Sequence, residues 1–463
     1  MTTLATLEQE LGPMLTTERA ARERCAGDAW VMAELDRLEG APRTLPLAVL
    51  EPRTTDEVSR AMALCRRLGV PVVPIGGGSG VCGAIEPGRD SVALSTRGLD
   101  GLRRLDASDL LAVFGAGTIG DEAEARVAAH GLTLGHWPQS IALSTVGGWV
   151  ATRASGQYST AYGSIEDLVL ALEVVLPDGR VLRTRETPRA SAGPDLRQLF
   201  LGSEGTLGVV TEVTLSLRAQ PEASRGHAFH FDGFRAGLEP VRRALRGGLA
   251  MPVARLYDAR ESRRTFREFV PRDRALLLLL HEGPAGVVSC DIEAMERLCR
   301  EAGGVATDAA VVDHWLAHRN RVPSFRSFLE QGVVVDTIEV AATWSRVGAL
   351  YEGVVAALSA VPGVLAASAH SSHSYRSGTC LYFSFAAKPE DRSQLRATYT
   401  ACWRAAMEAT LAAGGGIAHH HGIGRVRRAW LADEIGATGI ELLRAVKHAL
   451  DPANLLNPGN LLP

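Results

Sequence analysis

A long segment rich in glycine, serine and threonine, residues 135–156, constrains the fold of this chain more than any other feature. It lies between two strongly patterned regions and contains embedded apolar residues such as Trp149, which a flexible linker would lack. Glycine lets backbone approach a flat or charged ligand closely, and small hydroxyl groups form hydrogen bonds without bulk. A second glycine-rich loop, residues 74–83, follows the apolar run 70–75 directly. Two such loops predict a large, phosphate-bearing cofactor.

The composition excludes several classes of protein. A chain of 463 residues is expected to form two or three domains, and 46% hydrophobic with 22% charged residues is typical of a soluble globular protein. The net charge of -3 gives no reason to expect nucleic acid or a strongly anionic membrane surface as a partner. Seven cysteines without paired spacing argue against a disulfide framework and a zinc–cysteine site.

No secretion signal or membrane-spanning segment is expected. Residues 1–24 lack the hydrophobic core of a signal peptide, and the longest apolar run, residues 275–280, is far too short to cross a bilayer. We therefore expect a cytoplasmic protein with no transmembrane segment, which leaves room for peripheral membrane contact.

The sequence pattern divides the chain into four parts. Residues 1–41 show leucines at helical spacing, and residues 42–220 alternate short β-like runs with helices. Longer helices with a few strands follow over residues 221–415, and the tail 416–463 again has an unusual composition. We expect these parts to be an N-terminal helical segment, a cofactor domain, a second domain and a returning tail.

Local signals place several elements within the cofactor domain. Thr54 or Thr55 is expected to cap a helix that ends near Gly69. Residues 168–180 predict a β-hairpin, and residues 201–208 form a third glycine loop that leads into a strand.

The first glycine loop by itself allows two interpretations. Gly76–Gly80 does not fit the G-x-G-x-x-G spacing of a Rossmann fold, and no Walker lysine follows it, which excludes a nucleotide-hydrolysing P-loop. A cradle of backbone N–H groups for phosphates and a purely structural turn both remain open.

The three loops together resemble the FAD-binding domain of the vanillyl-alcohol-oxidase (PCMH-type) flavoprotein family. The resemblance implies that the first loop binds the pyrophosphate, the second follows the ribityl chain and isoalloxazine, and the third closes on the adenine side. Carried over residue by residue, the expected FAD-binding residues are Pro74, Ile75, Gly76, Gly77, Gly78, Ser79 and Gly80, then Pro138, Ser140, Ser144, Thr145, Gly147, Gly148, Trp149, Thr152, Arg153, Ala154 and Ser155, and finally Glu204, Gly205, Gly208, Val209 and Val210.

Within that family the chain most resembles the alkylglycerone-phosphate synthases. The resemblance implies an α+β fold with a two-part FAD domain over 42–220, a cap domain with an antiparallel sheet over 221–415, and a tail over 416–463 that returns to the flavin. It is carried, in order, by residues 144–156, 162–169, 193–195, 202–208, 419–424 and 430–431.

Three adjacent histidines, His419, His420 and His421, are the candidate acid/base groups. They cannot all face one way, so they make a poor set of three metal ligands, whereas a pKa near neutrality suits proton transfer. A solvent-facing accident is the alternative. The resemblance places His420 and His421 in the active site, with His421 the first choice.

Three further residues are candidates for catalysis or substrate binding, and for two of them a purely structural role is an alternative. Tyr382 is either an ordinary strand aromatic or, by resemblance, the catalytic tyrosine of the synthases. Arg326 is expected to receive the substrate phosphate, with Arg319 or Arg321 as substitutes. Arg255 also falls on a matched arginine, and a structural salt bridge explains it equally well.

A metal-dependent dehydrogenase is the main competing resemblance. Related D-2-hydroxy-acid dehydrogenases use histidines and a glutamate around a metal, and His370 with His373 raises that alternative here. The stretch 372–378 departs from their pattern and His420 stands at the glutamate position, so we expect no metal. The FAD is expected to be noncovalent, with Cys82 the one candidate for a tether.

Two activities therefore remain open. The first is the exchange of the acyl group of an acylated dihydroxyacetone phosphate for a fatty alcohol, with His421 and His420 transferring protons. The second is an FAD-dependent dehydrogenase or oxidase acting on an alcohol or a D-2-hydroxy acid. The expected partner is a small or lipid-like substrate, and a homodimer is expected because dimers are common among the resembling proteins.

Overall fold

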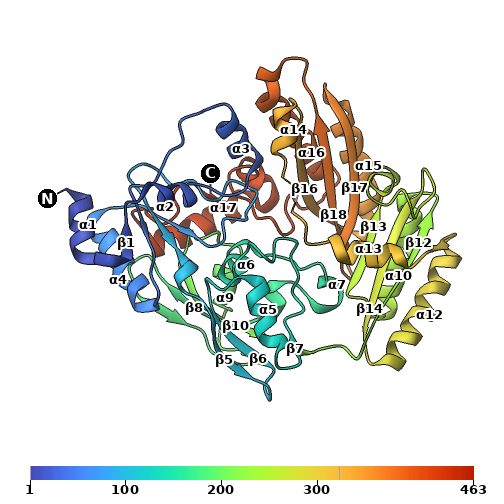
Figure 1. Cartoon of the computed structure of the whole chain (residues 1–463), viewed down its shortest axis with the longest axis horizontal. Helices are drawn as coiled ribbons and strands as arrows, with labels where there is room; N and C mark the ends of the chain where they lie inside the picture. Colours follow the sequence, from blue (N-terminus) through green and yellow to red (C-terminus); the bar gives the residue numbers. More distant parts are fainter. Residues whose placement is uncertain (1, 323, 463) are drawn as a thin grey trace.

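Two groups of strands lie next to each other in the computed structural model, which describes residues 2–322 and 324–462. In Figure 1 the first group, blue to green, is built from the first half of the chain, and the second, yellow to orange, follows it. Helices cover both groups, as expected for an α+β protein. The red C-terminal helix α17 (Leu431–Leu450) lies with the first group and not with the orange strands that precede it.

The first sheet is small and mostly parallel. Helix α4 (Thr55–Leu68) connects two of its strands, beginning where the Thr54 hydroxyl accepts the Glu57 N–H and ending at left-handed Gly69. Both ends agree with the sequence signals, and such an N-cap contributes about 1 kcal/mol. The strand order is β1 (Leu15–Thr16), β2 (Ala48–Leu50), β4 (Val92–Ser95) and β3 (Val72–Ile75), with β1 antiparallel to β2.

The second sheet is antiparallel and carries the second and third glycine loops. The predicted hairpin is present as β8 (Val169–Val175) and β9 (Val181–Arg183). Beside it lie β10 (Val209–Ser216), β6 (Leu111–Gly115) and β5 (Leu102–Asp106), of which β5 was not predicted. Packed on this sheet are α5 (Gly120–Ala128) and α6 (Val146–Thr152), whose apolar residues join one buried core.

The third sheet has seven strands, and all neighbouring pairs are antiparallel. Side chains alternate across it, so Leu381 and Phe383 of one strand face the buried core while Tyr382 between them faces the other side. The strand order is β15 (Val305–Thr307), β12 (Ala223–Phe231), β14 (Ala275–Gly283), β13 (Val253–Tyr257), β17 (Val364–Ser374), β18 (Gly378–Ala387) and β16 (Val334–Thr343). The core is closed by α10 (Phe234–Gly247), α12 (Ala285–Glu301), α15 (Trp344–Ala360) and α16 (Leu395–Ala412).

The two ends of the chain join the two groups of strands. Residues 1–41 are mostly helical, as predicted, but strand β1 within them pairs with β2. A strand of two residues is too short to show a periodic pattern, so it could not be predicted from the sequence. Helix α3 (Val31–Leu38) buries its apolar face in the core of the third sheet. In the tail, Asn457 donates its N–H to the Val72 carbonyl oxygen, so the tail runs along the edge strand β3.

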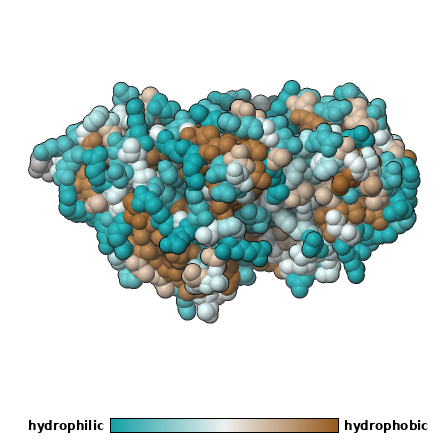
Figure 2. All heavy atoms as spheres, turned by 90° about the horizontal axis from the view of Figure 1, so that it is seen from below, coloured by the Kyte–Doolittle hydropathy of each residue, from teal (hydrophilic) through white to brown (hydrophobic). Residues whose placement is uncertain are grey.

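The surface and the cysteines add little to the architecture. Seen from below in Figure 2, hydrophobic residues occur in several patches among hydrophilic ones. Across residues 2–322 and 324–462, no helix is long and apolar enough to cross a membrane. All seven cysteines are free.

Candidate active site

A cavity of about 720 Å³ lies between the glycine loops and the open face of the third sheet. That volume is in the upper part of the range for ligand pockets, about 300–1,000 Å³. The residues predicted for cofactor, substrate and catalysis come from segments far apart in sequence, yet all but two of them line this one cavity. The two exceptions are Arg153 and His419.

Close contact between the first and second glycine loops requires residues without a side chain. A Cβ atom on Gly77 would lie 1.9 Å from the Leu143 carbonyl oxygen, and one on Gly76 would lie 2.4 Å from the Thr145 hydroxyl. The same threonine caps α6, since its hydroxyl accepts the Gly148 N–H. The loops therefore form one continuous wall of the cavity.

The first loop has the features of an anion cradle. Within the described part of the chain, the backbone N–H groups of residues 77–80 have no protein acceptor. Residues 78–80 are half-buried, where N–H groups are normally paired, and successive free N–H groups can bind phosphate oxygens. The geometry thus fits a pyrophosphate and favours the cradle over the structural turn.

Glu204 of the third loop holds the tail instead of pointing freely into the cavity. Its carboxylate accepts the N–H groups of Ile423 and Gly424 and one from the Asn460 side chain. Burial raises the pKa of Glu204, although these donors and Arg427 oppose the shift. The carboxylate of Glu204 is therefore already hydrogen-bonded to the tail, so any contact of this residue with FAD would come from its other atoms. Arg153, at the end of α6, bonds Gln198 and lies outside the cavity wall.

A second buried glutamate, Glu339 on β16, holds the histidine segment. Its Oε1 accepts the backbone N–H groups of His419, His420 and His421 at 3.2, 3.0 and 2.7 Å. Its Oε2 forms an ion pair with Arg427, and both side chains are fully buried. Burial alone would raise the pKa of Glu339, but Arg427, His421 and His420 outweigh it and hold that pKa far below its usual range.

The three histidines point in different directions, as expected. His420 and His421 line the cavity, whereas His419 turns away and its Nε2 bonds the Tyr375 hydroxyl at 2.7 Å. Burial lowers the pKa of all three imidazoles, that of His419 to about 4, although Glu339 opposes the shift. Each is therefore neutral at pH 7 and able to accept a proton.

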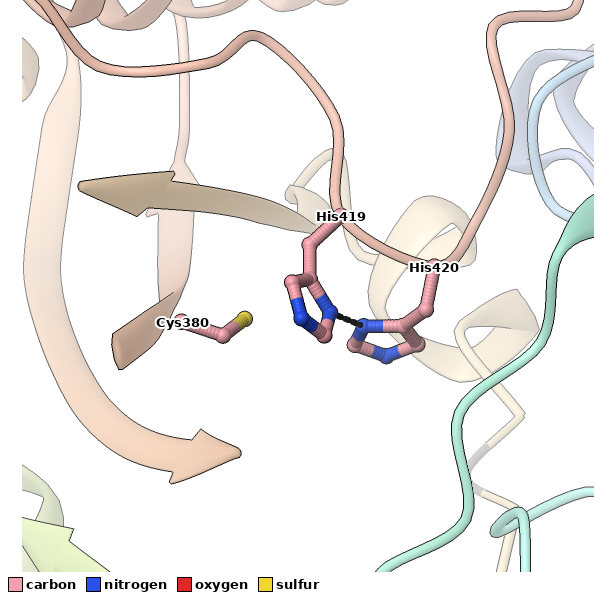
Figure 3. A group of neighbouring side chains, drawn as sticks. All are labelled: Cys380, His419 and His420. Carbon is pink, nitrogen blue, oxygen red and sulfur yellow. Dashed lines mark hydrogen bonds between the residues drawn. The ribbon is translucent and has the colours of Figure 1, made fainter. Parts of the chain in front are cut away.

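His419 and His420 also lie near a thiol. In Figure 3 the Cys380 sulfur points toward the His419 ring, with His420 beyond it, and donor atoms of the three lie within 4.8 Å of one another. The Nδ1 atoms of the two histidines already bond each other at 2.9 Å, and the other His419 nitrogen bonds Tyr375. These internal bonds explain the cluster, and we assign no metal to it.

Tyr382 stands at the centre of the third-sheet wall. Its hydroxyl bonds Thr337 at 3.0 Å, and its ring stacks on His370 and meets His421 edge-on at 5.5 Å. Burial raises the pKa of Tyr382, so the phenol is protonated and able to donate. The structure thus places Tyr382 beside the cavity histidines, and its catalytic role stays a prediction.

The arginines of the cavity differ in their partners. Arg255 bonds Tyr257 and His370, and Arg319 bonds Gln157 and stacks on Trp137, Tyr158 and Trp315. Among described residues neither has a carboxylate ion-pair partner, so the salt-bridge alternative for Arg255 does not apply. Arg326 pairs with Glu34 and Glu330 and is half-exposed, and Arg321 does not line the cavity.

Comparison with known proteins identifies the family. Residues 46–185 match the family described as FAD binding domain, and residues 220–461, over half of the chain, match FAD linked oxidases, C-terminal domain. The chain belongs to the FAD-linked oxidase family. Its first domain is thus an FAD-binding domain, and the protein is an FAD-dependent flavoenzyme.

The names of the similar proteins point to more than one activity. The chain is 30% identical to an "Alkyldihydroxyacetonephosphate synthase" of Trypanosoma brucei brucei, over 90% of this chain and 73% of that protein. It is 31% identical to "Uncharacterized FAD-linked oxidoreductase YgcU" of Escherichia coli strain K12, over 90% of this chain and 89% of that protein. A solved alkyldihydroxyacetonephosphate synthase superposes with a TM-score of 0.81 at 25% identity, covering 99% of this chain and 84% of the other. The predicted family resemblance and α+β fold are confirmed.

Several residues of this FAD-linked oxidase site were not predicted. Glu339 and Arg427 carry no motif, and their pairing appears only once β16 and the tail are folded together. Glu261, on α11 (Ala259–Thr265), bonds His370 Nδ1 at 3.0 Å and also lines the cavity. Asp28 and Trp30 also line the cavity, although they belong to the N-terminal segment. The only sequence signal there is Gly27, which indicates a loop between two helices.

Cys82, the candidate tether of this family member, is separated from the cavity. Its sulfur is buried, accepts a hydrogen bond from Arg427 at 2.9 Å and donates to the Gly422 carbonyl oxygen. Burial raises the pKa of the Cys82 thiol well above its usual value, which keeps it protonated. Its position behind the loop is that of a packing residue.

Proposed function

We propose that this flavoenzyme exchanges the acyl group of an acylated dihydroxyacetone phosphate for a fatty alcohol. In this reaction the bond between C1 and the acyl oxygen breaks and a bond between C1 and the alcohol oxygen forms. The acyl group leaves as a fatty acid, which takes the proton lost by the alcohol, so substrate and flavin end without net oxidation. FAD, when bound, would supply the electron-accepting group for the reacting carbon.

One observation carries this proposal. The cavity joins an FAD-side wall to a wall that presents two cations without carboxylate partners, a protonated phenol and neutral imidazoles. A phosphate needs guanidinium donors, a leaving carboxylate needs a proton donor, and removal of a C1 hydrogen needs a base. The synthase names of relatives at about 30% identity support the same assignment.

Each role falls to a residue of this chain. Arg255 and Arg319 bind the phosphate, and Arg326 is the weaker candidate because Glu34 and Glu330 already neutralise it. His421 accepts the C1 proton and returns it, and the Tyr382 O–H, which donates to Thr337 in the structure, would turn to donate a hydrogen bond to the departing carboxylate. FAD is held without a covalent bond, since Cys82 lies outside the cavity wall.

A net oxidation is the second candidate. It is favoured by the oxidoreductase relative and by the same two arginines, which would bind the carboxylate of a 2-hydroxy acid as readily as a phosphate. His421 would then take the hydroxyl proton, with bound FAD as the acceptor of the hydride from the substrate carbon and an external electron acceptor for its re-oxidation.

The two activities are separated by an anaerobic absorbance titration of the FAD-loaded protein. Palmitoyl-dihydroxyacetone phosphate with hexadecanol is one arm, and alcohols and D-2-hydroxy acids are the other. We expect ether-lipid formation and fatty-acid release while the oxidised flavin band persists at the end. Lasting loss of that band with an alcohol or hydroxy acid would contradict the proposal and establish the oxidation. His421→Gln is the control that removes the base in either case.

A further inference from the structure

The histidine segment, residues 419–424, is held between two buried carboxylates from opposite sides of the cavity. Glu339 of the third sheet accepts the N–H groups of residues 419–421, and Glu204 of the third glycine loop accepts those of residues 423–424. Between them, left-handed Gly422 fits because a Cβ atom there would lie 2.4 Å from Glu204 Oε1. The two glutamates share this anchoring role but differ in what else they face.

Only Glu339 faces an imidazole. Its Oε2 lies 3.5 Å from His421 Nδ1, which is buried and has no hydrogen-bond partner. No described protein group bonds the other ring nitrogen, Nε2, and His421 lines the cavity. The ring therefore presents one nitrogen to a carboxylate and leaves the other available to a substrate.

The remaining charged and titratable groups around His421 fix the balance of charge. Arg427 pairs with Glu339 and also donates to the Gly422 carbonyl oxygen, so it keeps the carboxylate ionised within the buried segment. His420 and His419 on the same segment are neutral, and Tyr382 from β18 presents a protonated phenol. Glu339 is thus the one anion that faces this ring.

We propose that Glu339 is the positioning residue of His421: it selects the Nδ1–H tautomer, so that Nε2 faces the cavity as the proton acceptor, while Arg427 compensates its charge. A carboxylate opposite one imidazole nitrogen fixes the tautomer and stabilises the imidazolium that forms when the other nitrogen takes a proton. Burial, and to a lesser extent the charge of Arg427, lower the pKa of His421, so the resting imidazole stays neutral beside the carboxylate. The inference rests on the proposed function for the direction of proton transfer, and the tautomer itself is independent of it.

The test is the protonation state of the His421 nitrogens, read by two-dimensional ¹⁵N NMR on histidine-labelled, FAD-loaded protein at pH 7.5. The His421→Gln variant assigns the signals by their loss. We expect a protonated Nδ1 and an unprotonated Nε2 in the wild-type protein. A wild-type signal from the Nε2–H tautomer, or from imidazolium, would overturn the proposal without any variant being needed.

Two matched variants separate positioning from anchoring. Glu339→Gln keeps an acceptor for the backbone N–H groups but removes the charge, so we expect the Nδ1–H preference to be lost and kcat to fall by about 100-fold or more. Glu204→Gln is the control, because it makes the same kind of change on the same segment away from the ring. It should lower thermal stability and leave the His421 signals unchanged.

The outcomes distinguish this inference from the proposed function. If Glu339→Gln retains the wild-type tautomer, or Glu204→Gln shifts it equally, Glu339 is only an anchor and the inference is wrong. If the tautomer behaves as expected but no ether lipid forms, the proposed function is wrong and the positioning role stands for another reaction.

Discussion

Single residues in the cavity differ by whether a neighbour already neutralises them. Arg326 was expected to receive the substrate phosphate, yet two carboxylates accompany it at 3.0 Å. Arg255, by contrast, forms no ion pair within 4 Å among the described residues, and its hydrogen-bond partners are neutral, one of them His370 at 2.7 Å; the charge of Glu261 acts on it from a greater distance. A cation without a partner at the wall of a cavity is available to an anionic substrate, whereas a paired one must first give up its ion pair.

This difference gives a prediction for substrate binding. Arg255→Met should raise KM for acyl-dihydroxyacetone phosphate about tenfold to a hundredfold, because hydrogen bonds to charged groups contribute about 1.5–3 kcal/mol. Arg326→Met should change KM by less than about threefold, because Glu34 and Glu330 already neutralise its charge and a contact of a half-exposed side chain with an anion is worth only about 0–1 kcal/mol. Steady-state kinetics on both variants measures this. Equal increases in KM would restore Arg326 as a phosphate ligand.

At the scale of elements, the FAD site depends on how closely the glycine loops approach each other. Gly77→Ala should prevent FAD binding, because its Cβ atom would lie 1.9 Å from the Leu143 carbonyl oxygen and would drive the loops apart. The measurement is the flavin absorbance near 450 nm per purified protein chain. Gly88→Ala is the matched control, since no atom lies within 4 Å of its added Cβ and the substitution should retain full flavin content.

Elements with local signals could be predicted from the sequence, and elements held by distant partners could not. The cap at Thr54, the end at Gly69 and the hairpin after Val169 each depend on a few adjacent residues. Likewise the glycine loops and the three histidines are recognisable as motifs, and the loops, His420 and His421 meet at one cavity. The anchoring roles of Glu204 and Glu339 depend on N–H groups far away in the chain, so the sequence singled out Glu204 only as an FAD-binding residue and did not single out Glu339.

For the whole molecule, buried titratable groups make stability depend on pH in opposite directions. Burial lowers the pKa of His136 to about 3, so below about pH 6.5 the unfolded chain binds a proton that the folded chain does not, and stability is lost as the pH falls. Burial raises the pKa of Asp28 to about 7, so between about pH 3.8 and 7 the folded chain holds the extra proton, and stability is lost as the pH rises.

Single substitutions should reveal the two contributions. His136→Phe keeps the edge-on contact with Trp149 and removes two ring nitrogens that have no hydrogen-bond partner. Relative to wild type it should gain about 1.4 kcal/mol between pH 7.5 and 5.5, measured by denaturant unfolding. Asp28→Asn should gain relative stability in the opposite direction, as the pH rises from 4 to 7. Parallel pH profiles for wild type and His136→Phe would show that His136 is protonated in the folded state.

Because the C-terminal tail lies along β3, the cavity can be completed only late in the synthesis of the chain. The first glycine loop is synthesised early, but Asn457, which donates to the Ala84 and Glu204 carbonyl oxygens, emerges hundreds of residues later together with the histidines. Until then a nascent chain can fold its sheets and still lack one wall of the cavity. The cavity is therefore complete only after translation has passed the tail.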